Sequence, residues 1–289
     1  MNNIKAFIAS DFHLDFWDSD LTDRDDVFWR IGFDQDDPYD LIILAGDIGQ
    51  CHHGTAQARY ITFLKHICSV GKPVILIKGN HENYKSQLVN SKFFLKSMQC
   101  ELFSNLYYLE KEHVDLIINN QKVRIFGATL WTDFNNYDPL AILEAKMKMY
   151  DFGSMILAPG YRKFLPEDAF LDHKEALQKM ISSSQGLSKD TRFIVVTHHA
   201  PMEKFVKDFR KKRNWNDTIE LLDYSYFSDL SKFIENNLTR KPDYWISGHI
   251  HSPYEFEEFG IKFISNPYGY GIDYEERLYQ DPFKVLEFN

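Results

Sequence analysis

The stretch PVILIKGNHEN, residues 73–83, joins a short apolar run to a group of polar side chains. The run Val74–Ile77 is apolar at every position, which predicts a strand covered on both faces. The amide of Asn80, the imidazole of His81 and the carboxylate of Glu82 follow directly. Alone, this group also fits a solvated turn, because Asn and Gly favour left-handed backbone. The rest of the chain decides between a turn and a site.

Four more apolar runs rich in Ile, Val and Phe predict further buried strands: Ile4–Ala9, Leu41–Ala45, residues 193–197 and Tyr244–Ser247. Between the runs Leu41–Ala45 and Val74–Ile77, Tyr60, Leu64 and Ile67 recur at helical spacing. The resulting β-α-β order favours an α/β sandwich with parallel strands at its centre.

Further elements are predicted in the second half of the chain. A helix begins at Asp138, a cap followed by Pro, and its apolar face consists of Leu140, Leu143, Met147 and Tyr150. Another helix is expected at about 227–238, and strands at 255–265 and 283–288. The chain has no repeat or low-complexity linker, so we expect one domain spanning residues 1–289.

All five central strands are followed by side chains that bind metals. In chain order these are Asp11 and His13, Asp47, Asn80, His198 and the adjacent His199, and His249 and His251. In open α/β sheets, loops at the carboxyl ends of the strands converge on one crevice. Each group alone fits a turn or a helix cap, but five groups in the same topological position predict a shared metal site.

The donor types restrict the metal. Carboxylate, imidazole and amide donors suit Mn²⁺, Fe or Zn²⁺, whereas Ca²⁺ prefers oxygen ligands alone. The three cysteines show no CxxC spacing and predict neither a thiolate site nor a disulfide framework. Seven donors overfill one ion but suit two that share a carboxylate. Two ions about 3.5–4 Å apart can activate a hydroxide and neutralise charge on a phosphoryl group.

The order D-x-H, G-D, G-N-H-[DE], H and G-H-x-H, from residue 11 to residue 251, resembles the calcineurin-like metallophosphoesterase superfamily. Residues 127–133, 195–201 and 266–270 resemble its small stand-alone bacterial and phage-type members. This resemblance implies a four-layer α/β/β/α sandwich with a mixed central β-sandwich. It also implies a dimetal site at the carboxyl ends of the strands.

The resemblance assigns a role to each motif residue. It implies that Asp11, His13 and His251 hold one ion, that Asn80, His198 and His249 hold the other, and that Asp47 bridges them. His198 is preferred over His199 because it comes first after its strand. His81 resembles the family's non-ligand histidine, which assists the transferring phosphoryl group. Glu82 is expected to orient His81 and to favour its protonated form, although a solvated carboxylate remains the alternative.

Substrate recognition leaves alternatives open. The segment 131–186 holds no ligand but many aromatic side chains, so it is either a helical lid or ordinary core; the aromatics are Phe134, Tyr137, Tyr150, Phe152 and Tyr161. The basic stretch 204–213 either reaches substrate phosphates or is solvated. Tyr268 and Tyr270, close to the expected site, either bind substrate or pack in a turn.

These observations predict a metal-dependent phosphoesterase that hydrolyses a small phosphodiester, with Mn²⁺ as the expected ion. A phosphomonoesterase is the alternative. A nuclease is disfavoured because 42 acidic residues outnumber 33 basic ones, giving a net charge of −9. A non-catalytic scaffold is disfavoured because no ligand is lost. No signal or membrane-spanning segment is recognised, which predicts a cytoplasmic protein without a membrane partner. The oligomeric state is left open.

Overall fold

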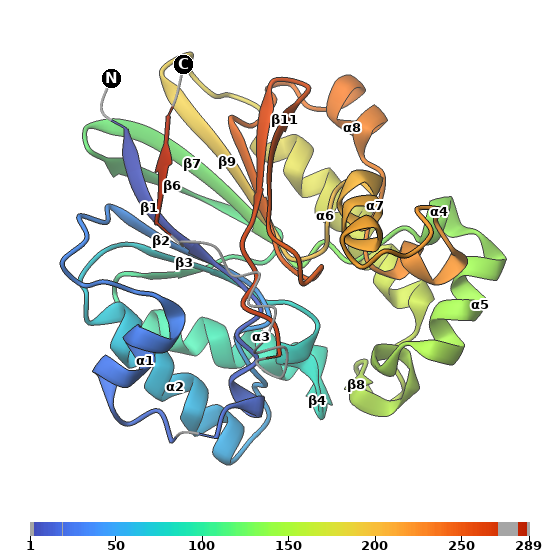
Figure 1. Cartoon of the computed structure of the whole chain (residues 1–289), viewed down its shortest axis with the longest axis horizontal. Coiled ribbons are helices and arrows are strands. Elements are labelled where there is room, and N and C mark those ends of the chain that lie inside the picture. Colours follow the sequence, from blue (N-terminus) through green and yellow to red (C-terminus); the bar gives the residue numbers. More distant parts are fainter. Residues whose placement is uncertain (1–2, 19, 271–282, 288–289) are drawn as a thin grey trace.

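Two β-sheets lie face to face, with helices on both outer sides, in the computed structural model of the chain (Figure 1). The structure describes residues 3–18, 20–270 and 283–287. Its α/β/β/α order confirms the four-layer sandwich expected from the sequence. All five predicted central strands are present, and four of them have the predicted bounds.

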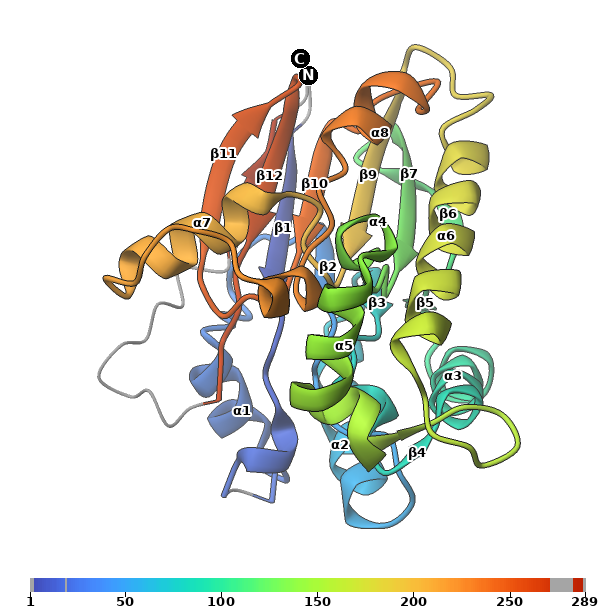
Figure 2. The same cartoon turned by 90° about the vertical axis from the view of Figure 1, so that its right-hand side faces the viewer.

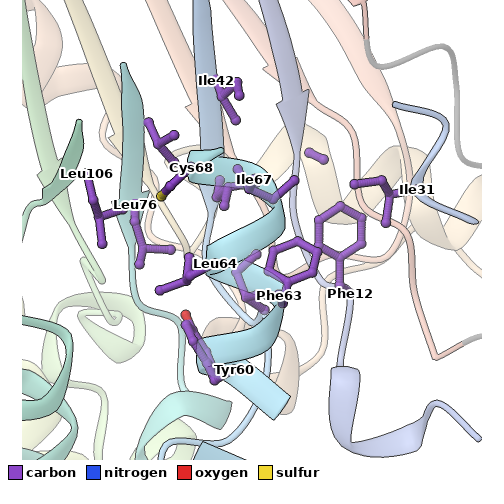
Figure 3. Close-up of a cluster of buried hydrophobic side chains, with 14 of the residues drawn as sticks. Phe12, Ile31, Ile42, Tyr60, Phe63, Leu64, Ile67, Cys68, Leu76 and Leu106 are labelled. Carbon is purple, nitrogen blue, oxygen red and sulfur yellow. The ribbon is translucent and has the colours of Figure 1, made fainter. Parts of the chain in front are cut away.

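The first sheet carries three of the five motif groups. Its order is β13 (Phe283–Leu286), β1 (Ile4–Ala9), β2 (Leu41–Ala45), β3 (Val74–Ile77) and β5 (Leu106–Tyr108), and all neighbours are parallel except β13 with β1. Its outer face is covered by α1 (Arg24–Ile31), α2 (Thr55–Cys68) and α3 (Leu88–Ser97). Figure 3 shows Tyr60, Leu64 and Ile67 of α2 directed into this core, as their spacing predicts.

The second sheet carries the other two motif groups. Its order is β11 (Tyr254–Glu258), β12 (Ile261–Ser265), β10 (Tyr244–Ser247), β9 (Thr191–Thr197), β7 (Gln121–Ala128) and β6 (Glu112–Ile118). Strands β12, β10, β9 and β7 are parallel, whereas β11 and β6 pair antiparallel at the two edges. The outer face is covered by α6 (Pro166–Ser183), α7 (Glu203–Lys212) and α8 (Ser231–Asn236).

The absence of alternation in the central strands has a simple cause. In β2, Leu41 and Ile43 pack between the two sheets, whereas Ile42 and Leu44 pack under the helices. Successive side chains of a strand point to opposite faces, and here both faces are apolar. The strand therefore reads as a continuous apolar run.

The hairpin of β6 and β7 was not predicted from the sequence. Its two-residue turn, Asn119 and Asn120, has φ values of 50° and 63°, in the left-handed region that Asn tolerates. Two Asn between segments containing Val and Ile are a hairpin signal that the sequence did offer.

A fourth apolar cluster is formed mostly by the segment 131–186, which was expected to be either a lid or core, together with Tyr84. It joins α4 (Phe134–Tyr137), α5 (Pro139–Lys148) and β8 (Ile156–Leu157), which pairs with β4 (Ser86–Gln87). Phe134 and Phe152 are buried in this cluster, so they belong to the core. Helix α6, at the end of the same segment, packs under the second sheet.

Helix α5 begins as predicted, because the Asp138 carboxylate accepts a hydrogen bond from the backbone N–H of Leu140 at 2.8 Å. Its buried face, however, is not the predicted one. Ala141, Ile142 and Ala145 are buried, while the predicted apolar face is between 51% and 78% exposed; it consists of Leu140, Leu143, Met147 and Tyr150. Small alanines allow close packing, and the spacing of apolar residues could not show this.

Other bounds differ from the prediction in small ways. The expected strand 255–265 is divided into β11 and β12 by a turn at Phe259 and Gly260, with φ values of 54° and 73°. The expected strand 283–288 is β13, which ends at Leu286, and Phe288 lies outside the described residues. None of the helices in the described ranges has the length and apolar character that a membrane span requires.

Candidate metal centre

The two sheets bring all the motif groups to one place. The loops after β1, β2 and β3 in the first sheet meet the loops after β9 and β10 in the second. Five of the seven predicted ligands are buried, and His249 and His251 are partly exposed; the five are Asp11, His13, Asp47, Asn80 and His198. The predicted convergence therefore exists as a buried cluster that is open on one side.

The first half of the cluster consists of Asp11, His13 and His251. The Asp11 Oδ1 atom lies 3.5 Å from His251 Nε2, and His13 Nε2 lies 3.1 Å from the same nitrogen. One potential ligand atom from each residue lies within 4.8 Å of those of the other two. This is the spacing of donors that surround one ion.

The second half surrounds His198. Its Nε2 atom lies 3.1 Å from Asn80 Oδ1, 3.1 Å from His249 Nδ1 and 3.3 Å from Asp47 Oδ2. The same Asp47 oxygen lies 3.9 Å from His13 Nε2 in the first half. Asp47 is therefore placed between the two halves, as a bridging carboxylate would be.

The donors fit divalent cations. Two pairs of imidazole nitrogens face each other at 3.1 Å, His13 with His251 and His198 with His249. Neutral imidazoles have one lone pair each, and a cation between two such lone pairs satisfies both. Two carboxylates, four imidazoles and one amide oxygen form a hard to intermediate donor set that suits Mn²⁺, Fe or Zn²⁺.

The motif glycines keep the cradle open. A Cβ atom at Gly79 would lie 2.1 Å from Asp47 Oδ1 and 2.6 Å from His198 Nε2. A Cβ atom at Gly46 would lie 2.6 Å from His198 Nδ1, and one at Gly248 would lie 2.8 Å from Asp11 Oδ2. Any side chain at these three positions would occupy the space around the ligand atoms.

The backbone at the cluster is held in an uncommon conformation. Asp11, His13, Asp47 and His249 have φ values of 56°, 46°, 53° and 68°. Left-handed backbone costs a non-glycine residue roughly 1 kcal/mol or more and is concentrated at functional sites. Four of the seven predicted ligands thus adopt a conformation that the surrounding packing must enforce.

Further hydrogen bonds orient individual ligands. The His198 Nδ1–H group donates to the carbonyl of Ala45 at 3.0 Å, which directs Nε2 into the cluster. Burial lowers the pKa of His198, but the adjacent Asp47 carboxylate outweighs burial and raises this pKa to about 10. A cation in the cluster would take the place of this proton as the partner of Asp47. The Asp11 carboxylate accepts the backbone N–H of His249 at 3.1 Å.

His81 lies next to His13 and Asp47, with which it forms a third possible donor group. Its ring stacks on Tyr84, with centroids 4.1 Å apart and an interplanar angle of 26°. Its backbone N–H donates to Asp47 Oδ1 at 2.9 Å, which links His81 to the bridging carboxylate. His81 Nδ1 is buried and has no hydrogen-bond partner among the described residues. This imidazole is available both to the cluster and to a molecule bound there.

The contacts of Glu82 differ from the expected contact with the His81 ring. Its carboxylate accepts the backbone N–H groups of Gly79, Ile48 and Asp47 at 2.7, 2.8 and 3.1 Å, and the Tyr60 hydroxyl at 3.1 Å. Burial, followed by the nearby Asp47, raises the pKa of Glu82 to about 8. Glu82 therefore joins the loop after β2 to the loop after β3. The sequence did not reveal these partners because three of the four are backbone groups.

Three other residues were expected near the site: His199 and Tyr270 lie beside the donors, and Tyr268 belongs to the core. His199 belongs to none of the donor groups in the described residues, and its Nδ1–H donates to the Thr129 carbonyl at 3.2 Å. Burial lowers the pKa of His199 to about 3, so the ring is neutral. Tyr270 stacks on His13 with centroids 4.4 Å apart. Tyr268 packs against Phe12 in the core.

Two site residues have no counterpart in the sequence analysis. The Asn80 Nδ2 group donates to the Tyr84 hydroxyl at 3.3 Å, and this hydroxyl donates to Asp151 Oδ2 at 3.4 Å. Asp151 is 2% exposed, and its Oδ1 has no hydrogen-bond partner among the described residues. Tyr84 is only 4 residues from Asn80, so the sequence gave a weak indication that the two are in contact. Asp151 is 67 residues from Tyr84 and gave none.

A cavity of about 650 Å³ opens onto this cluster. Asp47, His81 and His249 line it together with residues of α7 and residues that follow α5. Figure 2 shows α5 and α7 on the side of the molecule that faces the viewer. The donors are therefore accessible to a small molecule, and the chain supplies walls around it.

A four-layer sandwich with two adjoining Asp and His clusters at its strand ends defines a metal-dependent phosphoester hydrolase. The chain belongs to the calcineurin-like phosphoesterase family, whose model matches residues 4–253. Comparison with curated proteins gave no match.

Solved structures share this fold at low sequence identity. A phosphopantetheinyl hydrolase from Mycobacterium tuberculosis is similar with a TM-score of 0.67 and 13% identity, over 98% of this chain and 95% of that one. A putative 5′-nucleotidase from Staphylococcus aureus has a TM-score of 0.53 and 16% identity, over 99% of this chain and 54% of that one. At these identities the likeness shows the fold alone.

Proposed function

We propose that this protein hydrolyses a small phosphodiester in a reaction that depends on two divalent cations, with Mn²⁺ as the preferred ion and Fe or Zn²⁺ as alternatives. The observation that carries this proposal is the convergence of seven donors into two adjoining groups with Asp47 between them. Bound there, two cations would supply a hydroxide nucleophile and would neutralise charge on the phosphoryl oxygens.

The chain's own residues then have separate tasks. Asp11, His13 and His251 would hold one ion, and Asn80, His198 and His249 the other, with Asp47 shared. His81 lines the cavity beside Asp47 and donates a proton to the departing alcohol oxygen as the P–O bond breaks. Glu82 positions the backbone that carries Asp47 and Gly79.

The size of the cavity supports a diester. A volume of about 650 Å³ falls within the range of roughly 300–1,000 Å³ that is typical of sites for whole small molecules. Its walls continue past the donors to Tyr150 and Trp215, which leaves space for a second alcohol on the phosphate.

A single domain and a cytoplasmic location stay predictions.

The test is hydrolysis by metal-depleted protein to which Mn²⁺ is returned. Bis-p-nitrophenyl phosphate and p-nitrophenyl phosphate are compared, with Asp47→Asn as the inactive variant and the exposed Asp190→Asn as its matched control. We expect turnover that requires Mn²⁺, is faster for the diester, and is lost only in Asp47→Asn. Faster turnover of the monoester would overturn the diester assignment. Absence of metal-dependent turnover of both compounds would overturn the enzymatic assignment.

A further inference from the structure

The cavity extends beyond the metal centre along α7 and the loop that follows it. Phe209, Arg210, Arg213 and Trp215 line this part, and Tyr150 lines the same cavity after α5. The basic stretch 204–213, which the sequence left open between a solvated helix and a substrate contact, therefore contributes to the cavity wall. We define Phe209, Arg213, Trp215 and Tyr150 as the distal subsite.

The end of α7 is fixed to the loop of the metal ligands. Lys212 Nζ donates to Ser252 Oγ and to the Pro253 carbonyl, both at 2.9 Å. Ser252 directly follows the predicted ligand His251. Arg213, one residue beyond Lys212, is consequently carried on a segment that is held against the loop following His251.

Trp215 is also held in place. Its backbone N–H donates to the Arg210 carbonyl at 2.9 Å, and Arg210 Nε donates to the Asn216 carbonyl at 2.7 Å. The Trp215 ring lies edge-on to Phe209 at 5.9 Å and 5.8 Å from the Arg210 guanidinium. The side chain is nevertheless 54% exposed, so one aromatic face remains available to a ligand.

The positive charges around the cavity are not equivalent. The Arg210 guanidinium donates to Asp223 at 2.9 Å and to Glu220 at 2.6 Å, so carboxylates neutralise its charge. Lys148 pairs with Glu144 at 2.7 Å. Arg213 has no ion pair with a carboxylate among the described residues, and its guanidinium lies 4.9 Å from the centre of the Phe209 ring. Of the Lys and Arg residues that line the cavity in the described part of the chain, Arg213 is the one whose charge is left for a ligand.

The exposed aromatic rings and the unpaired guanidinium of the distal subsite indicate what kind of molecule binds there. Exposed aromatic faces stack on planar rings, and an unpaired guanidinium binds phosphate through two parallel hydrogen bonds. A molecule that satisfies both, while its scissile phosphate lies at the metal centre, carries a planar ring and a second phosphate. A nucleotide linked through a phosphodiester has this composition.

We infer that the distal subsite binds the base and the second phosphate of a small nucleotide-derived phosphodiester, with Trp215 stacking on the base and Arg213 binding the phosphate. This inference rests on the proposed function for the position of the scissile phosphate. It adds the class of substrate and two residues that determine specificity.

The test measures binding rather than turnover. Three ligands are titrated by calorimetry into the Mn²⁺-loaded protein: thymidine 3′,5′-bisphosphate, thymidine 5′-phosphate, and the abasic tetrahydrofuran analogue of the bisphosphate. The second ligand lacks one phosphate, and the third lacks the base. We expect each omission to raise Kd about tenfold, as the loss of one stacked base or one charge-assisted contact does.

Two variants assign the contributions. In Trp215→Ala the effect of removing the base should disappear, and in Arg213→Gln the effect of removing the second phosphate should disappear. The matched controls are Trp29→Ala, an exposed tryptophan of α1, and Lys211→Gln, an exposed cation of α7; neither lines the cavity. Both controls should retain both effects.

The outcomes separate this inference from the proposed function. Equal Kd values for the three ligands, or omission effects that persist in both variants, would overturn the subsite. If this occurs in protein that hydrolyses bis-p-nitrophenyl phosphate, the subsite is wrong and the phosphodiesterase stands. If the binding pattern holds without any hydrolysis, the subsite stands and the catalytic assignment fails.

Discussion

The Tyr84 hydroxyl accepts a hydrogen bond from the Asn80 Nδ2 group at 3.3 Å, which directs Asn80 Oδ1 towards His198 Nε2, 3.1 Å away. An amide can turn either its oxygen or its nitrogen to a metal, and only the oxygen is a ligand. Tyr84 is in turn a donor to Asp151 at 3.4 Å. The orientation of one predicted ligand therefore depends on two residues outside the family motifs.

Replacing Tyr84 with Phe tests this dependence. The ring that stacks on His81 is kept, and the hydroxyl that receives the Asn80 amide is lost. We expect metal affinity to fall by about tenfold, the usual effect of removing a partner that orients a ligand. Competition with a chelator measures this affinity. The exposed Tyr137→Phe is the matched control, and equal affinities in both variants would contradict the orienting role.

His81 and His249 should respond differently to truncation. His81→Ala should keep two equivalents of metal while turnover falls by about 10²–10⁴-fold, the contribution of a positioned acid. His249→Ala removes a predicted ligand and should lower the metal content itself. Elemental analysis of the purified variants, alongside their rates, distinguishes the two roles. A metal-free His81→Ala protein would show that His81 is a ligand, which its place in a donor group with His13 and Asp47 also permits.

Glu82→Gln should destabilise the fold. The carboxylate accepts three backbone N–H groups and the Tyr60 hydroxyl, whereas Gln turns an NH₂ group towards some of these donors. A buried donor that loses its acceptor costs about 1–3 kcal/mol, so we expect a loss in that range. Urea denaturation measures the loss. The exposed Glu235→Gln serves as control, and equal midpoints would refute the proposed tie between the loops.

His173 should make the protein less stable at acidic pH. It is buried on α6, and its Nδ1–H donates to the Leu130 carbonyl at 2.8 Å. Burial lowers the pKa of His173 below its ordinary value of 6.5. The unfolded chain therefore binds a proton near pH 6.5 that the folded chain does not, and stability is lost as pH falls below that value.

The measurement is the change in Tm between pH 7.5 and pH 5.5. We expect the Tm of His173→Gln, which can still donate to the Leu130 carbonyl, to decrease less over this interval than that of the unaltered protein. His53→Gln, at an exposed histidine, is the control. An identical decrease in all three proteins would exclude His173 as a source of acid lability.

The sequence predicted the strands well for a physical reason. A strand such as Val74–Ile77, apolar on both faces, can be buried only at the centre of a covered sheet, and the parallel order then fixes where its end lies. The seven ligand candidates followed from this. The partners of Glu82 could not be predicted, because most of them are backbone groups. The contact between Tyr84 and Asp151 could not be predicted either, because 67 residues separate the two.

Helix α5 shows a feature that the sequence could not predict. Periodicity identified the helix but not its buried side, because Ala141 and Ala145 pack closely while the longer Leu143 and Met147 remain exposed. Burial is set by what lies opposite, and a single helix does not contain that information. The cavity wall on α7 was likewise visible only as a basic stretch.

The origin of the ligands in two different sheets has a mechanical consequence. Asp11, Asp47 and Asn80 follow strands of the first sheet, whereas His198 and His249 follow strands of the second. A pair of ions at this edge would join the two halves of the sandwich, which are otherwise held by the apolar core and by hydrogen bonds such as Asn266 Nδ2 to the Ile8 carbonyl at 2.9 Å. Loading the ions would then restrain the two halves against separation at this edge.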